Sequence, residues 1–220
     1  MARIAIVGGH GKVALHLERL LAEAGHETTA LIRNPDHADD VRAAGGNPVV
    51  ADVEHLDVAA LADLLRGHDA VVWSAGAGGG NPARTYAVDR DAAIASMTAA
   101  QQAGTRRYVM VSYFGAGPDH GVAEDNSFFP YAEAKAAADA HLRGTDLDWT
   151  ILGPGSLTSD PPTGLIDTGS AAAGGTVSRA DVAAVAAAVL DRPATVHRTI
   201  EFNNGLTPIS AFLDALGTNS

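Results

Sequence analysis

Strand-like and helix-like segments alternate along almost the whole chain, and this alternation constrains the fold more than any other feature. It begins with RIAIVG (3–8), a short β-branched run, and KVALHLERLLAEAG (12–25), whose apolar residues recur at helical spacing. Later runs such as VVWSA and VMVS are almost continuously apolar, as expected of strands buried on both faces. Regular alternation of this kind predicts an α/β fold with a Rossmann-type, doubly wound parallel sheet.

The length and composition of the chain agree with one sizeable domain over residues 1–220. A chain of 220 residues with 46% hydrophobic residues can bury a substantial core. Residues 155–177 differ from the rest, since they are rich in Gly, Ser, Thr and Pro and show little periodicity. We therefore expect a single domain with an irregular insert at 155–177, near its C-terminal third.

Several classes of function are disfavoured by composition. The formal charge of −11 argues against nucleic-acid binding, which needs a concentrated basic surface. The nine histidines form no helical ligand pair and cysteine is absent, so no metal site is expected. No apolar run approaches the roughly eighteen residues of a membrane span, and the N-terminus lacks signal-peptide architecture. We expect a cytoplasmic protein without a membrane or nucleic-acid partner.

A glycine-rich turn, GGHGKVA (8–14), follows the first expected strand and opens the first expected helix. Dinucleotide binding needs a tight turn, close approach of the backbone to a diphosphate, and a helix N-terminus that offers free N–H groups. A purely structural turn is the alternative, but the position between strand and helix favours the cofactor. The residues expected to contact the cofactor here are Gly8, Gly9, His10, Gly11, Lys12 and Val13.

The end of the second expected strand bears on the choice of cofactor. The strand ends in ALIRNPD, with Arg33 at its tip and no acidic residue before Asp36. An arginine accommodates the 2′-phosphate of NADP, whereas an acidic residue would bind the ribose of NAD. We expect NADP, with NAD as an alternative if Arg33 is merely a solvated loop residue.

The ends of the third and fourth expected strands should face the same ligand crevice. Asp52 ends the third strand, and Ala75 and Gly76 follow the fourth. We expect these residues, together with Val53, to contact the cofactor. Asp52 could instead cap a turn.

The segment YAEAK holds one of only two lysines in the chain, Lys135, four residues after one of only four tyrosines, Tyr131. On a helix the two side chains project from one face. A nearby ammonium stabilises phenolate and lowers a tyrosine pKa toward the range useful for proton transfer. A solvated Tyr/Lys face on an alanine-rich helix is the alternative.

The chain resembles the short-chain dehydrogenase/reductase superfamily over essentially its whole length. The resemblance is to its atypical or extended NAD(P)-binding branch, which includes NmrA-like and epimerase/dehydratase-like proteins. It is carried by GGHGKVA, the LIR strand end, WSAG, RRYVMVSYFG, YAEAK, ILGPGSL and SRADVAAV.

The resemblance implies roles for five residues. Tyr131 would be the general acid or base, and Lys135 would hold the nicotinamide ribose and depress the tyrosine pKa. Ser112, at the end of the fifth expected strand, would hydrogen-bond the substrate oxygen. Pro154 and Gly155 would lie beside the nicotinamide.

Two positions depart from the family pattern, because Gly153 stands where related sequences often have Arg, and Asp89 near where many have Asn. We expect an NADP-dependent oxidoreductase that acts by hydride transfer on a carbonyl or alcohol of a small molecule. Its substrate would lie between Ser112, Tyr131 and the 155–177 segment. The alternatives are a non-catalytic NADP(H) sensor that binds a protein partner, and an epimerase or dehydratase that uses bound cofactor.

Overall fold

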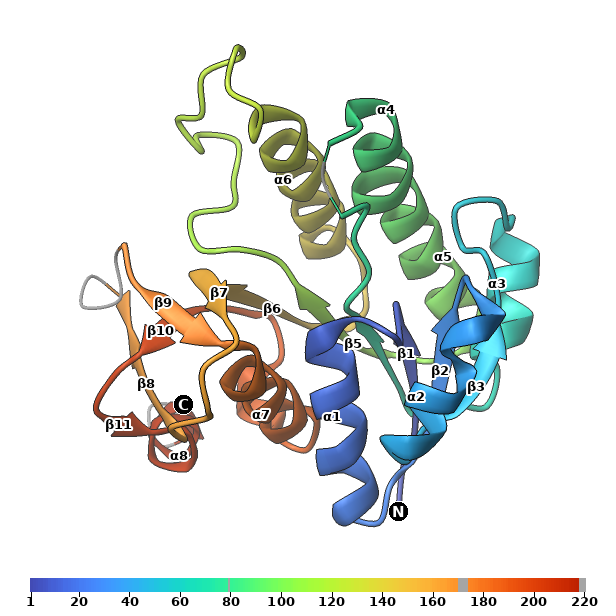
Figure 1. The fold of residues 1–220 in the computed structure, drawn as a ribbon, viewed down its shortest axis with the longest axis horizontal. Coiled ribbons are helices and arrows are strands. Elements are labelled where there is room, and N and C mark those ends of the chain that lie inside the picture. Colours follow the sequence, from blue (N-terminus) through green and yellow to red (C-terminus); the bar gives the residue numbers. More distant parts are fainter. Residues whose placement is uncertain (79, 170–173, 218–220) are drawn as a thin grey trace.

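A computed structural model describes residues 1–78, 80–169 and 174–217 of the chain. Within these residues a nine-stranded sheet has the order β11-β8-β10-β6-β5-β4-β1-β2-β3 (Figure 1), and β7 pairs with β9 beside it. The strands are β1 (Arg3–Val7), β2 (Glu27–Ile32), β3 (Asn47–Val50), β4 (Ala70–Trp73), β5 (Arg107–Val111), β6 (Asp148–Pro154), β7 (Ser156–Thr158), β8 (Leu165–Thr168), β9 (Thr176–Ser178), β10 (Arg198–Asn204) and β11 (Thr207–Pro208).

The strands β1 to β6 and β10 pair in parallel, as the alternating pattern predicts. The two remaining strands, β8 and β11, are antiparallel and form one edge of the sheet. Nine residues of the segment 155–177 lie in β7, β8 and the start of β9, so the segment is not irregular throughout. Its role as an insert on the substrate side stays a prediction. These strands are short and rich in Ser, Thr and Asp, so their sequence lacks the apolar pattern of a buried strand. Residues 170–173 of the insert lie outside the described residues.

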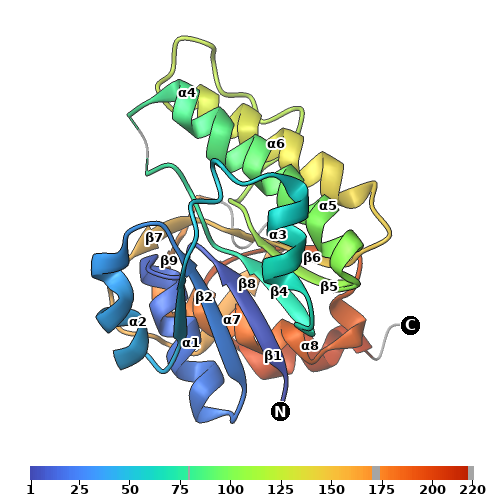
Figure 2. The same cartoon turned by 90° about the vertical axis from the view of Figure 1, so that its right-hand side faces the viewer.

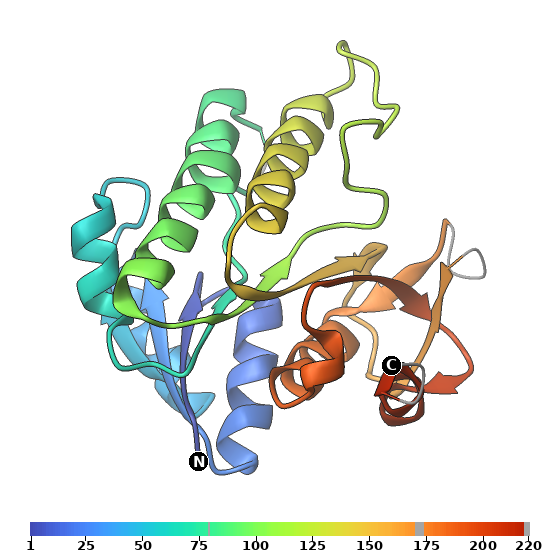
Figure 3. The same cartoon turned by 180° about the vertical axis from the view of Figure 1, so that it is seen from behind.

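Helices cover both faces of the sheet (Figure 2). The helices are α1 (Lys12–Glu23), α2 (Ala38–Ala43), α3 (Val58–Leu65), α4 (Pro82–Thr85), the π-helix η2 (Tyr86–Ala92), α5 (Ala93–Ala103), α6 (Phe129–Arg143), α7 (Arg179–Leu190) and α8 (Ile209–Gly217), with short 3₁₀ turns η1 (Pro35–His37) and η4 (Pro193–Thr195). Viewed from behind, the N-terminal elements (blue and cyan) lie at one side and the C-terminal elements (orange and red) at the other (Figure 3). Within the described residues, no helix is long and apolar enough to span a membrane.

Alternate residues of the central strands pack into two hydrophobic cores, one on each face of the sheet. Ile4 and Ile6 of β1 pack in one core with α1 and α7, while Ala5 and Val7 pack in the other with α3, α5 and α6. Successive side chains of a strand point to opposite faces, and both faces here are covered by helices. The uninterrupted apolar strands of the sequence follow from this burial.

The parallel strands direct their carboxyl ends to one edge of the sheet. Gly8 follows β1, Arg33 follows β2, Ala75 lies just beyond β4, and Ser112 follows β5. In doubly wound sheets, ligands bind in the crevice at this edge. The fold therefore gathers most of the candidate residues along a single edge.

Candidate active site

The glycine-rich loop after β1 leaves no room for side chains. Gly8 has a φ of +84°, and a Cβ there would lie 2.5 Å from the Cα of Ala75. A Cβ on Gly9 would lie 2.5 Å from the Cβ of Ala30 on β2. The loop thus packs directly against the ends of β2 and β4, and glycine is needed for both contacts.

The first turn of α1 offers unpaired backbone donors beside this loop. Gly11 is the N-terminal cap, and no side chain caps the helix. The N–H groups of Lys12, Val13 and Ala14 have no acceptor within the helix, because the first turn of an α-helix never provides one. These donors and the helix dipole suit a diphosphate, so the loop fits the cofactor that its sequence predicts.

The side chains of His10, Lys12 and Val13 turn in three different directions. The ring of His10 stacks on His37 with centroids 3.6 Å apart, and its Nε2 lies 2.9 Å from Oδ2 of Asp40. The Val13 side chain is buried in the core. Lys12 is exposed and lines a hollow shared with residues 158–162 and Arg179. Contact with a cofactor through these side chains stays a prediction.

A cavity of about 170 Å³ lies at the ends of β1, β2 and β4, and it is here called the adenosine cavity after the part of the cofactor that we expect there. It brings together six of the residues expected to contact the cofactor. Its lining comprises Gly8, Leu31, Arg33, Asn34, His37, Ala51, Asp52, Val53, Glu54, Ala75, Gly76, Arg84 and Val88.

Arg33 and Asp52 behave differently at this cavity. Arg33 is exposed and makes no hydrogen bond or ion pair with any described residue, so its guanidinium is available to a ligand. Asp52 accepts a weak hydrogen bond from the backbone N–H of Glu54, 3.3 Å from its Oδ1. Asp52 therefore supports a turn while also lining the cavity.

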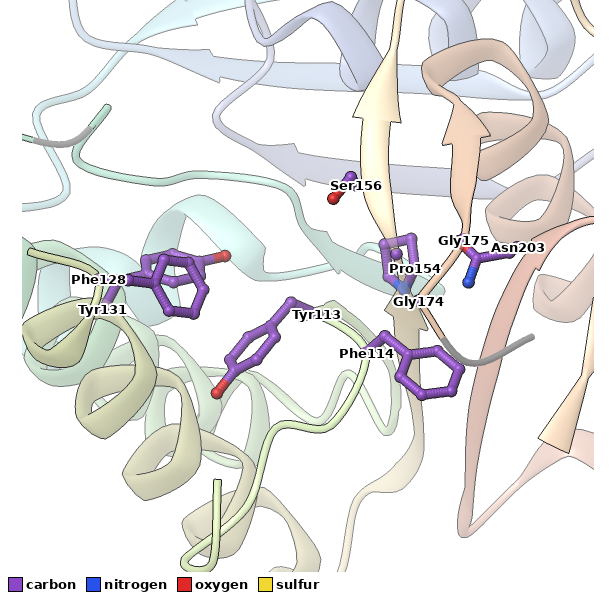
Figure 4. Close-up of a pocket in the computed structure, with 10 residues that line it drawn as sticks. Tyr113, Phe114, Phe128, Tyr131, Pro154, Ser156, Gly174, Gly175 and Asn203 are labelled. Atoms are coloured by element: carbon purple, nitrogen blue, oxygen red, sulfur yellow. The ribbon is translucent and has the colours of Figure 1, made fainter. Parts of the chain in front are cut away.

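A second cavity of about 310 Å³, here called the inner cavity, lies beyond the ends of β5 and β6 (Figure 4). Phe128 and Tyr131 lie on one side of it, and Pro154 on the other, with Tyr113 between them. The full lining comprises Tyr113, Phe114, Phe128, Tyr131, Pro154, Gly155, Ser156, Gly174, Gly175 and Asn203. The structure thus brings Tyr131 together with the Pro154–Gly155 loop.

Three aromatic rings form one wall of the inner cavity. The ring of Tyr113 lies 5.2 Å from that of Phe128, nearly perpendicular to it, and 5.6 Å from that of Tyr131. The rings of Phe128 and Tyr131 are also 5.2 Å apart. Such packing fixes the Tyr131 ring in place and offers an apolar face to a flat ligand.

A third cavity, here called the outer cavity, encloses about 800 Å³ on the far side of Tyr131. It lies between the loop after β4 and the loop before α6. Its lining comprises Gly76, Ala77, Gly78, Gly80, Asn81, Pro82, Thr85, Glu124, Asn126, Ser127, Phe128, Pro130 and Tyr131. Phe128 and Tyr131 therefore border both the inner and the outer cavity.

Lys135 lies in the interior of the protein, in a buried set of ionisable side chains that also includes Asp89 and Asp139. It is 1% exposed, and its Nζ donates to the carbonyl oxygen of Val111 at 2.9 Å. Burial lowers the pKa of Lys135, and the nearby carboxyl groups of Asp139 and Asp89 partly offset this. The ammonium thus shares its surroundings with two acids rather than with solvent.

Ser112 is bound to one of these acids. Its Oγ donates to Oδ2 of Asp139 at 2.6 Å, and both residues are buried. Burial raises the pKa of Asp139, which Lys135 and the Ser112 hydrogen bond lower again. Burial likewise raises the pKa of Asp89, whose Oδ2 accepts from the backbone N–H of Ala77.

The phenol of Tyr131 is less acidic than an ordinary tyrosine. Burial raises its pKa, and the negative charges of Asp89 and Asp139 raise it further. The expectation that Lys135 lowers this pKa is wrong in this structure, because burial and the charges of Asp89 and Asp139 raise it. Tyr131 is therefore protonated at neutral pH.

Of the three expected catalytic residues, only Tyr131 lines a described cavity. Ser112 and Lys135 lie beneath it, and a direct contact of either with substrate or ribose stays a prediction. Sequence reasoning missed Asp139, although its spacing of four from Lys135 places it on the same helical face. It also missed Asn203, which β10 brings from far along the chain.

Among the described residues, no group of three or more His, Asp or Glu side chains could hold a metal ion. The site offers instead a glycine-rich loop at a helix N-terminus, an exposed arginine at the end of β2, and a phenol next to a buried set of ionisable side chains. These features define a Rossmann-type dinucleotide-binding protein.

Comparison with known proteins identifies the family. A sequence model of the NAD(P)H-binding family matches residues 8–193, so the chain belongs to this family and binds NAD(P). The uncharacterised sugar epimerase YhfK of Bacillus subtilis is 33% identical, over 97% of this chain and 100% of its own length. The predicted resemblance to atypical short-chain dehydrogenase/reductase proteins is thereby confirmed.

Solved structures agree with this family. A protein of Bacillus halodurans, whose name places it among NAD-dependent epimerases/dehydratases, has a TM-score of 0.90 at 32% identity, covering 98% of this chain and 100% of its own. The oxidoreductase ylbE of Lactococcus lactis has a TM-score of 0.86 at 27% identity, with 98% and 97% covered.

Proposed function

We propose that this protein is an NADPH-dependent reductase of small carbonyl compounds, with Tyr131 as the proton donor. The observation that carries the proposal is the position of the Tyr131 phenol. It borders the inner cavity opposite Pro154 and Gly155, at the edge of the sheet that also carries the glycine-rich loop. A carbonyl compound in this cavity would meet a proton donor on one side and the cofactor loop on the other.

The preference for NADPH rests on Arg33. Its exposed guanidinium borders the adenosine cavity without a partner among the described residues. A planar guanidinium recognises phosphate with two parallel hydrogen bonds, and no acidic side chain directly precedes it to take the ribose hydroxyl of NAD.

Reduction of a carbonyl needs Tyr131 in its protonated state. A bound dihydronicotinamide supplies the hydride for such reductions. Because burial and two nearby acids raise the pKa of Tyr131, its phenol stays protonated at neutral pH and can donate to the carbonyl oxygen. Alcohol oxidation would instead need the phenolate, which this environment disfavours. Reductase activity should accordingly persist into alkaline solution, since the proton is lost only above the ordinary tyrosine pKa.

The test is the oxidation of NADPH at 340 nm across a panel of aldehydes, ketones and quinones. Tyr131→Phe should lower turnover at least about 100-fold while NADPH binding persists, because general acid catalysis contributes that much. Tyr86→Phe is the matched control, since Tyr86 lies on η2 and borders neither the inner nor the outer cavity.

A non-catalytic NADP(H) sensor is the second candidate, and one observation favours it. Ser112 is expected to bind the substrate oxygen, but its hydroxyl donates a hydrogen bond to Asp139 instead. Tight NADPH binding without turnover on the whole panel, together with no effect of Tyr131→Phe, would establish the sensor and reject the reductase.

A further inference from the structure

Positive charge is distributed unevenly among the three cavities. The adenosine cavity is lined by Arg33, Arg84 and His37 together with the acids Asp52 and Glu54, and Arg84 pairs with Glu54. The exposed guanidinium of Arg33 suits a phosphate group of a dinucleotide. Of the described residues that line the inner and outer cavities, none is Lys, Arg or His. The two cavities next to Tyr131 therefore offer an anionic ligand no cationic side chain.

Two cations close to these cavities, Arg84 and Lys135, are already paired with other groups. The Nε of Arg84 lies 3.1 Å from Oε2 of Glu54, and its Nη1 donates to the carbonyl oxygen of Ala77 at 2.6 Å. Lys135 is 1% exposed and lies among Asp89 and Asp139. An anionic group placed beside Tyr131 would lose its hydration without gaining an ion pair, which is costly.

Among the described residues that line the inner and outer cavities, the one charged side chain is acidic. Glu124 is exposed on the loop before α6 and borders the outer cavity. The side chains of Asn81, Asn126 and Ser127 accompany it, and they can donate or accept hydrogen bonds without adding charge. The chain as a whole carries a formal charge of −11, which also repels anions.

Shape restricts the ligand further. Phe128 and Tyr131 border both cavities, so a ligand that reaches the phenol can extend from one cavity into the other. The neighbouring rings of Tyr113, Phe128 and Tyr131 favour a flat apolar body packed against them.

We propose that the substrate is an uncharged or cationic carbonyl compound with a flat apolar body, and that Glu124 discriminates against anions. This inference rests on the proposed reductase function and narrows its substrate class. It excludes phosphorylated sugars, nucleotide sugars and carboxylates as good substrates.

The experiment compares three benzaldehydes that differ at the 4-position: trimethylammonio, methyl and carboxylate. Because their intrinsic reactivities differ, the measured quantity is the ratio of kcat/KM for the cationic and the anionic aldehyde in each variant. Glu124→Lys should lower this ratio by about tenfold, and Glu124→Gln by about threefold, as expected for an exposed charge near a bound ligand. The control is Asp125→Lys, which makes the same change of charge at the neighbouring exposed residue outside the cavity lining and should leave the ratio nearly unchanged.

Binding provides a readout that does not need turnover. Saturation-transfer NMR on the protein with NADP⁺ should detect benzylamine and benzyl alcohol more strongly than benzoate. If no aldehyde is reduced but this order of binding holds, the reductase proposal fails and the charge preference stands. Stronger binding or reduction of the anionic member, or equal effects of Glu124→Lys and Asp125→Lys, would overturn the inference, as would the absence of binding by all three probes.

Discussion

Lys135, Asp89 and Asp139 share a buried space beneath Tyr131. Burial is the largest cause of the raised pKa of Tyr131, and the charges of Asp89 and Asp139 raise it further. Asp89 stands near where many relatives of the resembled superfamily have Asn. That single change of residue type accounts for part of the difference between the expected and the observed electrostatics.

Arg33 tests the choice of cofactor at the residue scale. Arg33→Ala should weaken NADP⁺ binding about tenfold or more, because it removes charge-assisted hydrogen bonds to the 2′-phosphate, and should leave NAD⁺ binding nearly unchanged. Isothermal titration with both cofactors measures this. Arg66→Ala is the control, since Arg66 is exposed and its guanidinium pairs with Asp63. An equal loss of affinity for the two cofactors would show that Arg33 does not bind the 2′-phosphate.

Glu18 of α1 makes stability depend on pH. Its side chain is fully buried, and neither carboxyl oxygen has a hydrogen-bond partner among the described residues. Burial raises the pKa of Glu18 from 4.5 to about 8, and Arg19 offsets this in part. Because the folded protein binds this proton more tightly than the unfolded chain, the free energy of unfolding falls as pH rises through that interval.

Glu18→Gln should remove this fall in the free energy of unfolding with rising pH, since glutamine does not ionise. Urea unfolding at about pH 5 and about pH 8 should show the variant gaining on the order of 1 to 3 kcal/mol over the natural protein at the higher pH. Glu23→Gln on the exposed face of the same helix should give no such gain. A Glu18→Gln variant with the same pH dependence as the natural protein would refute the assignment.

At the scale of elements, the predicted and observed structures differ where packing decides between alternatives. The helical run from η2 into α5 begins as a π-helix over Tyr86–Ala92. Its extra residue per turn cannot be read from an alanine-rich pattern. The strand β8 was also missed, because its pairing with β10 is a tertiary contact between short polar segments.

Asp181 connects α7 with the segment that precedes β8. Its carboxylate accepts from the backbone N–H groups of Thr163 and Gly164 at 2.9 and 2.8 Å, and from the Ser178 hydroxyl at 2.8 Å. Asp181 thus ties the start of α7 to the segment before β8, and it is fully buried. Ser178 also caps α7, because its Oγ accepts a hydrogen bond from the Asp181 N–H.

Asp181→Ala should lower the free energy of unfolding by about 1 to 3 kcal/mol, because it leaves the buried Ser178 hydroxyl and the backbone N–H groups of Thr163 and Gly164 without their acceptor. Limited proteolysis should also cut the segment between β7 and β8 sooner than in the natural protein. Asp160→Ala, an exposed acid on that segment, should do neither. Unchanged stability of Asp181→Ala would mean that water replaces the carboxylate and that the tie is unimportant.

At the scale of the whole molecule, the parallel part of the sheet and the edge that carries the ligand could be predicted from sequence. Local sequence patterns were enough for this prediction, because the periodicity and the glycines of each strand–helix unit indicate where it begins and ends. The assembly of the cavities could not be predicted in the same way. The inner cavity joins Tyr113, Tyr131, Gly155 and Asn203, which come from four elements or loops far apart in sequence.

The inward orientation of Ser112 has the same origin. From sequence, a serine at the end of β5 is expected to face the ligand, and nothing local to it indicates a partner. The partner is Asp139, which the packing of α6 on the sheet brings within 2.6 Å. Residue types and strand ends were therefore predictable, whereas side-chain partners across elements were not.

The proposed reaction is net transfer of hydride from NADPH to a carbonyl carbon at the cavity bordered by Tyr131. NADPH that carries deuterium at C4 of the nicotinamide tests this transfer, with the product of each carbonyl in the panel analysed by mass spectrometry. We expect one deuterium in the product alcohol for each NADP⁺ formed, from one of the two C4 positions only, and at least about 100-fold less in Tyr131→Phe. Binding of NADPH without deuterium in any product, or interconversion of stereoisomers without net oxidation of NADPH, would contradict it.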